Sequence, residues 1–281
     1  MHNIENSPLH QFAEQFPLQY LEGQRGCRLA YRHCVHQPVA DKLVILVNGR
    51  VENILKWTEI AQDFYAQGYD VLLFDHRGQG YSQRLLPDSE KGHLDEFRFY
   101  AQDMAKIIEN VTALYPYEQQ YLLAHSLGAL ISTYYLANFD HQIKRAVFSA
   151  PFFGMPLSHP IRDEIVLNFM MLFGQGKRYV FGKGPYKPVD VQENLLSHDS
   201  TRMQRMNELN LANPEIRLGG PTFRWAYLCL IAIKNLPKIL PRIETPVLVL
   251  EAEQEQIVNN KTLEKLTALF MHGSLKKIAG H

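Results

Sequence analysis

The chain has 281 residues, 46% of them hydrophobic, and its 29 basic and 29 acidic residues give a formal net charge of zero. A chain of this length can bury one large core, as one domain or as one domain with an insertion. The balanced charge argues against a nucleic-acid partner and against a general attraction to anionic surfaces.

The first half of the chain alternates strand patterns with helix patterns. Residues 28–36 alternate as in a strand. Continuous apolar runs predict strands buried on both faces, at 43–47, 71–74, 121–124 and 146–150. Helical spacing over 54–64 predicts a helix that ends near Gly68, and Asp95 is positioned to cap a later helix. This order predicts an α/β fold with a mostly parallel sheet and helices on both faces.

A glycine-containing turn follows the run at 71–74. The glycines of Asp75-His76-Arg77-Gly78-Gln79-Gly80 are compatible with a dinucleotide-binding loop, but Gln83 stands where the third glycine is required. No spacing among the twelve histidines indicates a metal site. We therefore expect an ordinary turn here, and neither a cofactor nor a metal ion.

The alternation ends after Pro151. Residues 152–240 show no clear strand pattern, and two apolar segments, 161–173 and 223–233, flank a basic, glycine-rich loop at 174–187. Their large apolar side chains could line a tunnel or form a small core of their own: Met170, Met171, Leu172, Phe173, Trp225, Leu228, Leu230 and Ile231. We expect a helical insertion.

The sheet pattern resumes with an apolar run at 247–250, followed by the acidic cluster 251–255. A further helix and a candidate last strand precede His281, the final residue of the sequence. These patterns divide the chain into a core, residues 1–151 and 241–281, and an inserted helical segment, residues 152–240, which the resemblance described below identifies as a cap.

The stretch Ala124-His125-Ser126-Leu127-Gly128 has the layout of a nucleophile elbow, a tight strand-to-helix turn that exposes a serine hydroxyl. Small residues two positions before and after the serine suit this turn, because strand and helix pass close together there. The free N–H groups at the start of the helix suit a developing oxyanion. Ser126 is the candidate nucleophile; a buried serine at a strand–helix junction is the alternative.

Acyl transfer also needs a base, an orienting acid and an oxyanion hole. In α/β-hydrolases the triad runs in the order serine, acid, histidine. The acidic cluster and then His281 follow Ser126 in that order. The main-chain N–H groups of Leu127 and of Arg50, in the loop after the run at 43–47, are the candidate donors of the oxyanion hole.

With these motifs the chain resembles the monoglyceride lipase-like α/β-hydrolases and, within them, the bacterial lysophospholipases. The resemblance runs from about residue 20 to 281. The stretches that carry it are 48–52, 75–82, 92–97, 124–128 and 252–260, with 219–222 and Trp225 in the insertion. It implies an α/β-hydrolase fold, a helical cap over the active site, and the ester of a single-chain lipid as substrate.

The resemblance also assigns roles by position. Ser126 is the nucleophile, Glu255 the acid and His281 the base, and Arg50 and Leu127 supply the oxyanion hole. Most relatives have aspartate where Glu255 stands, so Glu253 is a rival. Relatives continue past the histidine into a closing helix, so either the chain is truncated or His281 is not the equivalent histidine.

Four basic side chains of the insertion could meet a lipid phosphate or could form a solvated loop: Lys177, Arg178, Lys183 and Lys187. The chain has three cysteines without a CxxC pair, no signal-peptide pattern, and no apolar run long enough to span a bilayer. We therefore expect buried thiols and a cytoplasmic location. Peripheral contact with the inner face of the membrane and the oligomeric state stay open.

These observations predict a serine hydrolase that cleaves the carboxylic ester of a lysophospholipid through an acyl-enzyme. Within the same class, the alternative is a monoacylglycerol lipase or a general carboxylesterase. From another class, the alternative is an inactive homologue that only binds lipid. The predicted partner in each case is a single-chain lipid.

Overall fold

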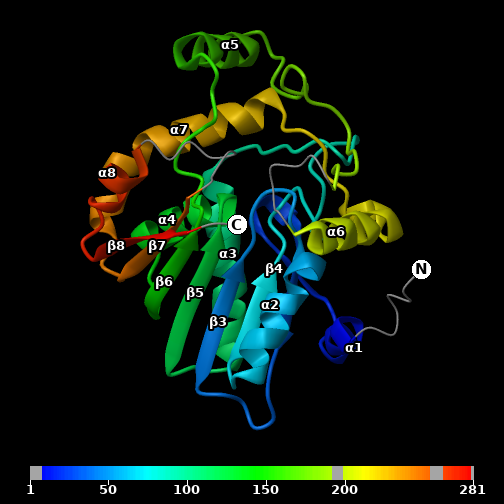
Figure 1. Cartoon of the computed structure of the whole chain (residues 1–281), viewed down its shortest axis with the longest axis vertical. Coiled ribbons are helices and arrows are strands. Elements are labelled where there is room, and N and C mark those ends of the chain that lie inside the picture. The colour runs from blue at the N-terminus through cyan, green and yellow to red at the C-terminus, as the bar shows by residue number, and fades with distance from the viewer. Residues whose placement is uncertain (1–7, 192–198, 254–261, 280–281) are drawn as a thin grey trace.

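The computed structural model describes residues 8–191, 199–253 and 262–279, which form an eight-stranded sheet with helices on both faces (Figure 1). The strand order across the sheet is β1-β2-β4-β3-β5-β6-β7-β8. The β1–β2 and β2–β4 pairs are antiparallel, and all pairs from β4 to β8 are parallel. The strands are β1 (Gln19–Glu22), β2 (Arg28–Cys34), β3 (Lys42–Val47), β4 (Asp70–Phe74), β5 (Gln119–His125), β6 (Ile143–Ser149), β7 (Val247–Ala252) and β8 (Gly273–Ile278).

The predicted α/β-hydrolase architecture is confirmed, and both faces of the sheet are covered. Helices α1 (Pro8–Gln15) and α2 (Ile54–Ala66) pack on one face, and α3 (Arg98–Leu114) and α4 (Leu127–Asn138) pack on the other. Side chains alternate along a strand, so Ile45 of β3 packs with the α3 and α4 layer and Leu46 with the α1 and α2 layer. This is why β3 is a continuous apolar run.

The prediction that Asp95 caps a helix was wrong. Helix α3 begins at Arg98, and its N-cap position is Phe97, which makes no side-chain cap. The carbonyl of Asp95 instead accepts two hydrogen bonds from the guanidinium of Arg224, at 2.8 and 3.0 Å. Asp95 therefore helps to hold a segment that is distant in sequence.

The described residues between β6 and β7 form helices and no strand. They contain α5 (Pro160–Leu172), α6 (Ser200–Ala212) and α7 (Phe223–Ile239), with the short 3₁₀ helices η3 (Pro214–Ile216) and η4 (Leu240–Arg242). Figure 1 shows α7 crossing one end of the sheet and α5 lying beyond α7, farther from the sheet. Helix α7 is joined to α4 by a hydrogen bond from the Tyr134 hydroxyl to the carbonyl of Ala232, at 2.9 Å.

The remaining elements are small: η2 (Gln24–Gly26) and α8 (Leu263–Thr267). As predicted, Cys27, Cys34 and Cys229 are buried free thiols. Burial raises the pKa of Cys27 to about 11, so this thiol stays protonated near neutral pH. Across the described parts of the chain, every helix is too short or too polar to cross a bilayer.

Candidate active site

Ser126 occupies a strained turn between β5 and α4. Its backbone has φ 49° and ψ −116°, a region that costs a non-glycine residue roughly 1–3 kcal/mol. Neighbouring main chain holds the turn: the N–H of Ser126 donates to the carbonyl of Ser149 at 3.0 Å, and its carbonyl accepts from the N–H of Phe152 at 3.0 Å. The strain is therefore maintained by the end of β6 and the segment that follows it.

Close packing explains the small residues around Ser126. A Cβ atom added to Gly128 would lie 2.3 Å from the carbonyl oxygen of Val47 and 2.5 Å from that of Asn48. Ala124, on the other side of the serine, is fully buried. Helix α4 thus meets the end of β3 backbone to backbone, as the elbow motif predicts.

The loop between β3 and α2 lies directly beside the serine. A Cβ atom added to Gly49 would be 3.2 Å from the Cβ of Ser126. The N–H of Gly49 is already used, because it donates to Oε2 of Glu52 at 2.6 Å. The N–H groups of Arg50 and Leu127 donate no hydrogen bond within the described ranges of the chain. Leu127 directly follows Ser126, and Arg50 directly follows Gly49, the residue that packs beside Ser126.

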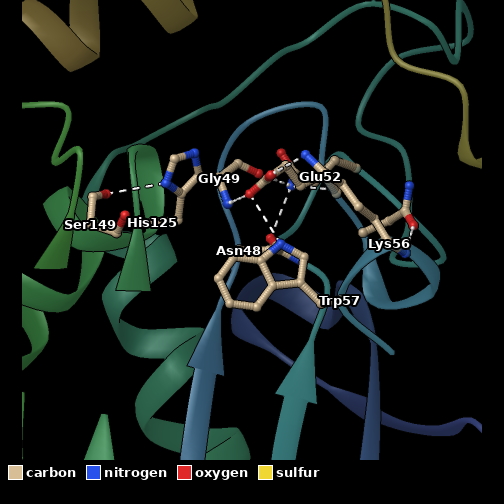
Figure 2. A network of polar contacts seen from close by, with 9 residues as sticks. Asn48, Gly49, Glu52, Lys56, Trp57, His125 and Ser149 are labelled. Carbon is tan, nitrogen blue, oxygen red and sulfur yellow. Dashed lines mark hydrogen bonds and ion pairs between the residues drawn. The ribbon is translucent and has the colours of Figure 1, made fainter. Parts of the chain in front are cut away.

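A buried carboxylate organises this loop, and Figure 2 shows its contacts. Besides the N–H of Gly49, Glu52 accepts from the indole of Trp57 at 3.1 Å and from the ammonium of Lys56 at 2.5 Å. Burial raises the pKa of Glu52, but the charges of His125 and Lys56 and the hydrogen bonds from Lys56 and Gly49 outweigh it, so the pKa lies below its usual value. Glu52 is therefore ionised at neutral pH.

The side-chain amide of Gln79 reinforces the same loop. Its Nε2 donates to the carbonyls of Gly49 and Glu52, at 2.9 and 3.0 Å. Sequence reasoning did not give Glu52 or Gln79 a role. The one feature of the sequence that pointed to these two residues was their place in stretches that resemble the family. Nothing in the local pattern shows that two segments 27 residues apart share one hydrogen-bond network.

The glycine turn after β4 is structural, as expected. Asp75 is fully buried and accepts from the N–H groups of Ile54 and Tyr81, at 2.9 and 2.8 Å. Gly80 has φ 54°, and a Cβ atom there would lie 2.1 Å from Oδ2 of Asp75, so a side chain cannot fit. Burial raises the pKa of Asp75 to about 7.

His76 Nε2 lies 2.9 Å from the carbonyl oxygen of Asn48. Burial lowers the pKa of His76 to about 4, so the neutral ring donates this hydrogen bond.

Glu255 and His281 lie outside the described residues. The rival acid, Glu253, directly follows β7, and its N–H donates to the carbonyl of Ile278 at 3.2 Å. Because β5 to β8 are parallel neighbours, the C-terminal end of β7 lies at the same edge of the sheet as Ser126.

Apolar and aromatic side chains lie on the α7 side of the serine. Phe152, whose N–H contacts Ser126, stacks on Trp225 with a centroid distance of 6.1 Å. The indole of Trp225 donates to the hydroxyl of Tyr100 at 3.1 Å. The guanidinium of Arg50 lies over the Trp225 ring, 5.1 Å from its centroid. These four side chains connect the elbow, the β3–α2 loop and α7.

The tunnel hypothesis was wrong for two of its residues. Leu172 and Phe173 are 81% and 59% exposed, so they face outward from α5 and line no interior space. Met170, Trp225 and Leu230 are buried in the main hydrophobic cluster, which fits the alternative of core packing. The candidate phosphate-binding side chains of the loop are all exposed: Lys177, Arg178, Lys183 and Lys187.

Comparisons with known proteins agree with this geometry. Residues 38–276 match the family described as "Serine aminopeptidase, S33". A "Probable lysophospholipase L2" of Haemophilus influenzae is 63% identical over 96% of this chain and 86% of its own length, and "Lysophospholipase L2" of Escherichia coli K12 is 33% identical over 86% and 70%. A soluble variant of monoglyceride lipase from Saccharomyces cerevisiae has the same fold, with a TM-score of 0.71, 20% identity and coverage of 94% of this chain and 86% of that one.

Proposed function

The chain belongs to the family described as "Serine aminopeptidase, S33", and from this premise we propose that it hydrolyses the carboxylic ester of a lysophospholipid. One observation carries the chemistry: Ser126 stands in a strained turn beside the β3–α2 loop, and the N–H groups of Leu127 and of Arg50, in that loop, donate no hydrogen bond within the described residues. The names of the two bacterial relatives support the substrate class.

In the proposed mechanism, Oγ of Ser126 attacks the ester carbonyl carbon while His281 takes its proton. Glu255 orients His281 and stabilises its charged form. The N–H groups of Arg50 and Leu127 donate to the oxyanion of the tetrahedral intermediate. A single donor of this kind stabilises the oxyanion by roughly 3–4 kcal/mol. His281 then protonates the leaving glycerol oxygen, and water releases the fatty acid from the acyl-enzyme.

We propose that residues 152–240 form a cap whose outer helix rests on a membrane. On α5, a line of apolar side chains at helical spacing faces solvent: Ile161, Ile165, Phe169, Leu172 and Phe173. Between Ile165 and Val189 the sequence contains four basic residues and no acidic residue. An apolar face beside basic side chains suits an anionic bilayer surface, from which a single-chain lipid would enter.

The function is tested with Ser126→Ala, assayed against a lysophospholipid and a monoacylglycerol of the same acyl chain. Loss of the nucleophile should reduce turnover of the lysophospholipid roughly a million-fold, and should abolish labelling by a fluorophosphonate, while the circular dichroism spectrum stays that of the parent. A parent protein that prefers the monoacylglycerol would assign the substrate to the lipase alternative. A parent that binds lipid but hydrolyses neither compound would make the chain a binding protein.

A further inference from the structure

Arg50 carries a positive charge that no acidic side chain neutralises within the described part of the chain. Its Nη2 donates to the carbonyl of Gly219 at 2.5 Å, and its guanidinium lies over Trp225. Its Nε is buried and has no hydrogen-bond partner there. Burial lowers the pKa of Arg50 to about 10, yet this still leaves the side chain charged at neutral pH.

Arg77 provides a contrast with the environment of Arg50. The whole Arg77 side chain is buried, whereas Arg50 is partly exposed, and Asp103 accepts from Nε of Arg77 at 2.6 Å and from its Nη2 at 2.8 Å. A buried cation without such a counter-charge is costly, since neither solvent nor an anion replaces its hydration. Ionisable groups whose pKa is shifted by burial cluster at functional sites.

The surroundings of Arg50 are shaped to hold the guanidinium. A Cβ atom on Gly92 would lie 2.5 Å from Nη2 of Arg50, so glycine is required for the side chain to occupy this position. Gly219 supplies the carbonyl contact and Trp225 the ring surface. The loop that carries Arg50 also borders the reacting group, because the preceding Gly49 approaches the Cβ of Ser126.

The dimensions of the substrate match this arrangement. In a lysophospholipid, six bonds separate the ester carbonyl carbon from the phosphorus, which spans roughly 7 Å when extended. The arginine side chain reaches roughly 6 Å from its Cα to its guanidinium carbon. If the main-chain N–H of Arg50 donates to the ester oxygen of a lysophospholipid, the guanidinium of Arg50 can therefore reach the phosphate of that same lipid molecule.

We propose that Arg50 determines specificity by binding the phosphodiester of the lysophospholipid, whose negative charge pairs with the guanidinium. Planar guanidinium groups bind phosphate oxygens through two parallel hydrogen bonds, and Trp225 orients the plane. This inference rests on the proposed function and refines it. The exposed basic loop at 174–187, considered above for the same role, then contributes to the membrane surface and not to recognition of the head group.

The test compares 1-palmitoyl-lysophosphatidylcholine with 1-palmitoylglycerol, using the parent, Arg50→Gln, Arg50→Lys and the triple variant Lys177→Gln, Arg178→Gln, Lys183→Gln. The measured quantity is the ratio of kcat/KM for the two substrates. Arg50→Gln should lower this ratio roughly ten- to hundred-fold, mainly through KM of the phospholipid, as expected for loss of a charged hydrogen bond. Arg50→Lys should lower the ratio less, and the triple variant should leave it unchanged.

Equal losses on both substrates in the Arg50 variants would show that Arg50 only clamps Gly219 and Trp225, and would overturn the proposal. A parallel measurement needs no variant: sn-glycero-3-phosphocholine should inhibit hydrolysis of 1-palmitoylglycerol by the parent, and glycerol at the same concentration should not. No difference between the two compounds would also overturn it. Failure of the proposed function looks different, since the parent itself would then prefer 1-palmitoylglycerol or would hydrolyse neither substrate through Ser126.

Discussion

Gly128→Ala should damage both the stability and the activity of this protein. In an ordinary helix the change would favour folding by about 1 kcal/mol, because alanine is the better helix former. In α4 the new methyl group would lie 2.3 Å from the carbonyl oxygen of Val47, where Cβ atoms approach no closer than 3.0 Å. Helix α4 and the end of β3 must therefore separate by the difference, about 0.7 Å.

Backbone atoms on both sides resist this separation. Overpacking of this kind costs about 1–3 kcal/mol, so after the gain in helix propensity the expected net loss in the free energy of unfolding is up to about 2 kcal/mol. For a chain of this size we expect a fall in Tm of up to roughly 8 °C. The displaced loop carries the N–H of Arg50, and an error of about 1 Å in such a donor costs roughly a hundred-fold in rate. A ten- to hundred-fold fall in kcat should follow.

The assays are thermal unfolding and hydrolysis of a lysophospholipid. Gly184→Ala is the matched control, because a Cβ atom at Gly184 would meet no atom within 4 Å, and it should behave like the parent. If Gly128→Ala matches Gly184→Ala in Tm and kcat, then close contact between α4 and β3 does not hold the oxyanion hole, and the reasoning is refuted.

Three further predictions concern the acid, the loop and the outer helix. Glu255→Gln should lower kcat far more than Glu253→Gln, because an amide cannot stabilise a charged histidine; the reverse order would reassign the acid. The pKa of Glu52 in the folded protein lies below its value of 4.5 in the unfolded chain. The ionised Glu52 therefore contributes its full stabilisation above pH 4.5, and this stabilisation is lost as the pH falls through the folded pKa. As the pH is lowered below 4.5, the free energy of unfolding measured by denaturant titration should therefore fall less for Glu52→Gln than for the parent. Phe169→Ser with Leu172→Ser should reduce co-sedimentation with anionic vesicles while hydrolysis of dispersed substrate persists, and unchanged sedimentation would remove α5 from the membrane contact.

Local patterns determined the order of the strands along the chain, the elbow and the helical segment between β6 and β7. These features depend on short-range physics: a strand buried on both faces must be apolar throughout, and a strand that meets a helix at close range must have small residues there. Ala124 and Gly128 could therefore be read directly from the sequence. The same logic failed for β1 (Gln19–Glu22), whose residues are mostly exposed and show no apolar alternation.

Tertiary structure decided the features that depend on which segments become neighbours. The sequence of α5 shows apolar residues but not that Leu172 and Phe173 face solvent, because α7 covers only one side of the helix. The sequence of the whole chain contains Glu52 and Gln79, but it does not show that both side chains hold the main chain of Gly49. From the sequence, Arg50 was predicted only as a main-chain donor. Folding brings Gly92, Gly219 and Trp225 around its guanidinium. Burial and unpaired charge belong to the assembled fold, since desolvation depends on every segment that packs around a group and not on its neighbours in sequence.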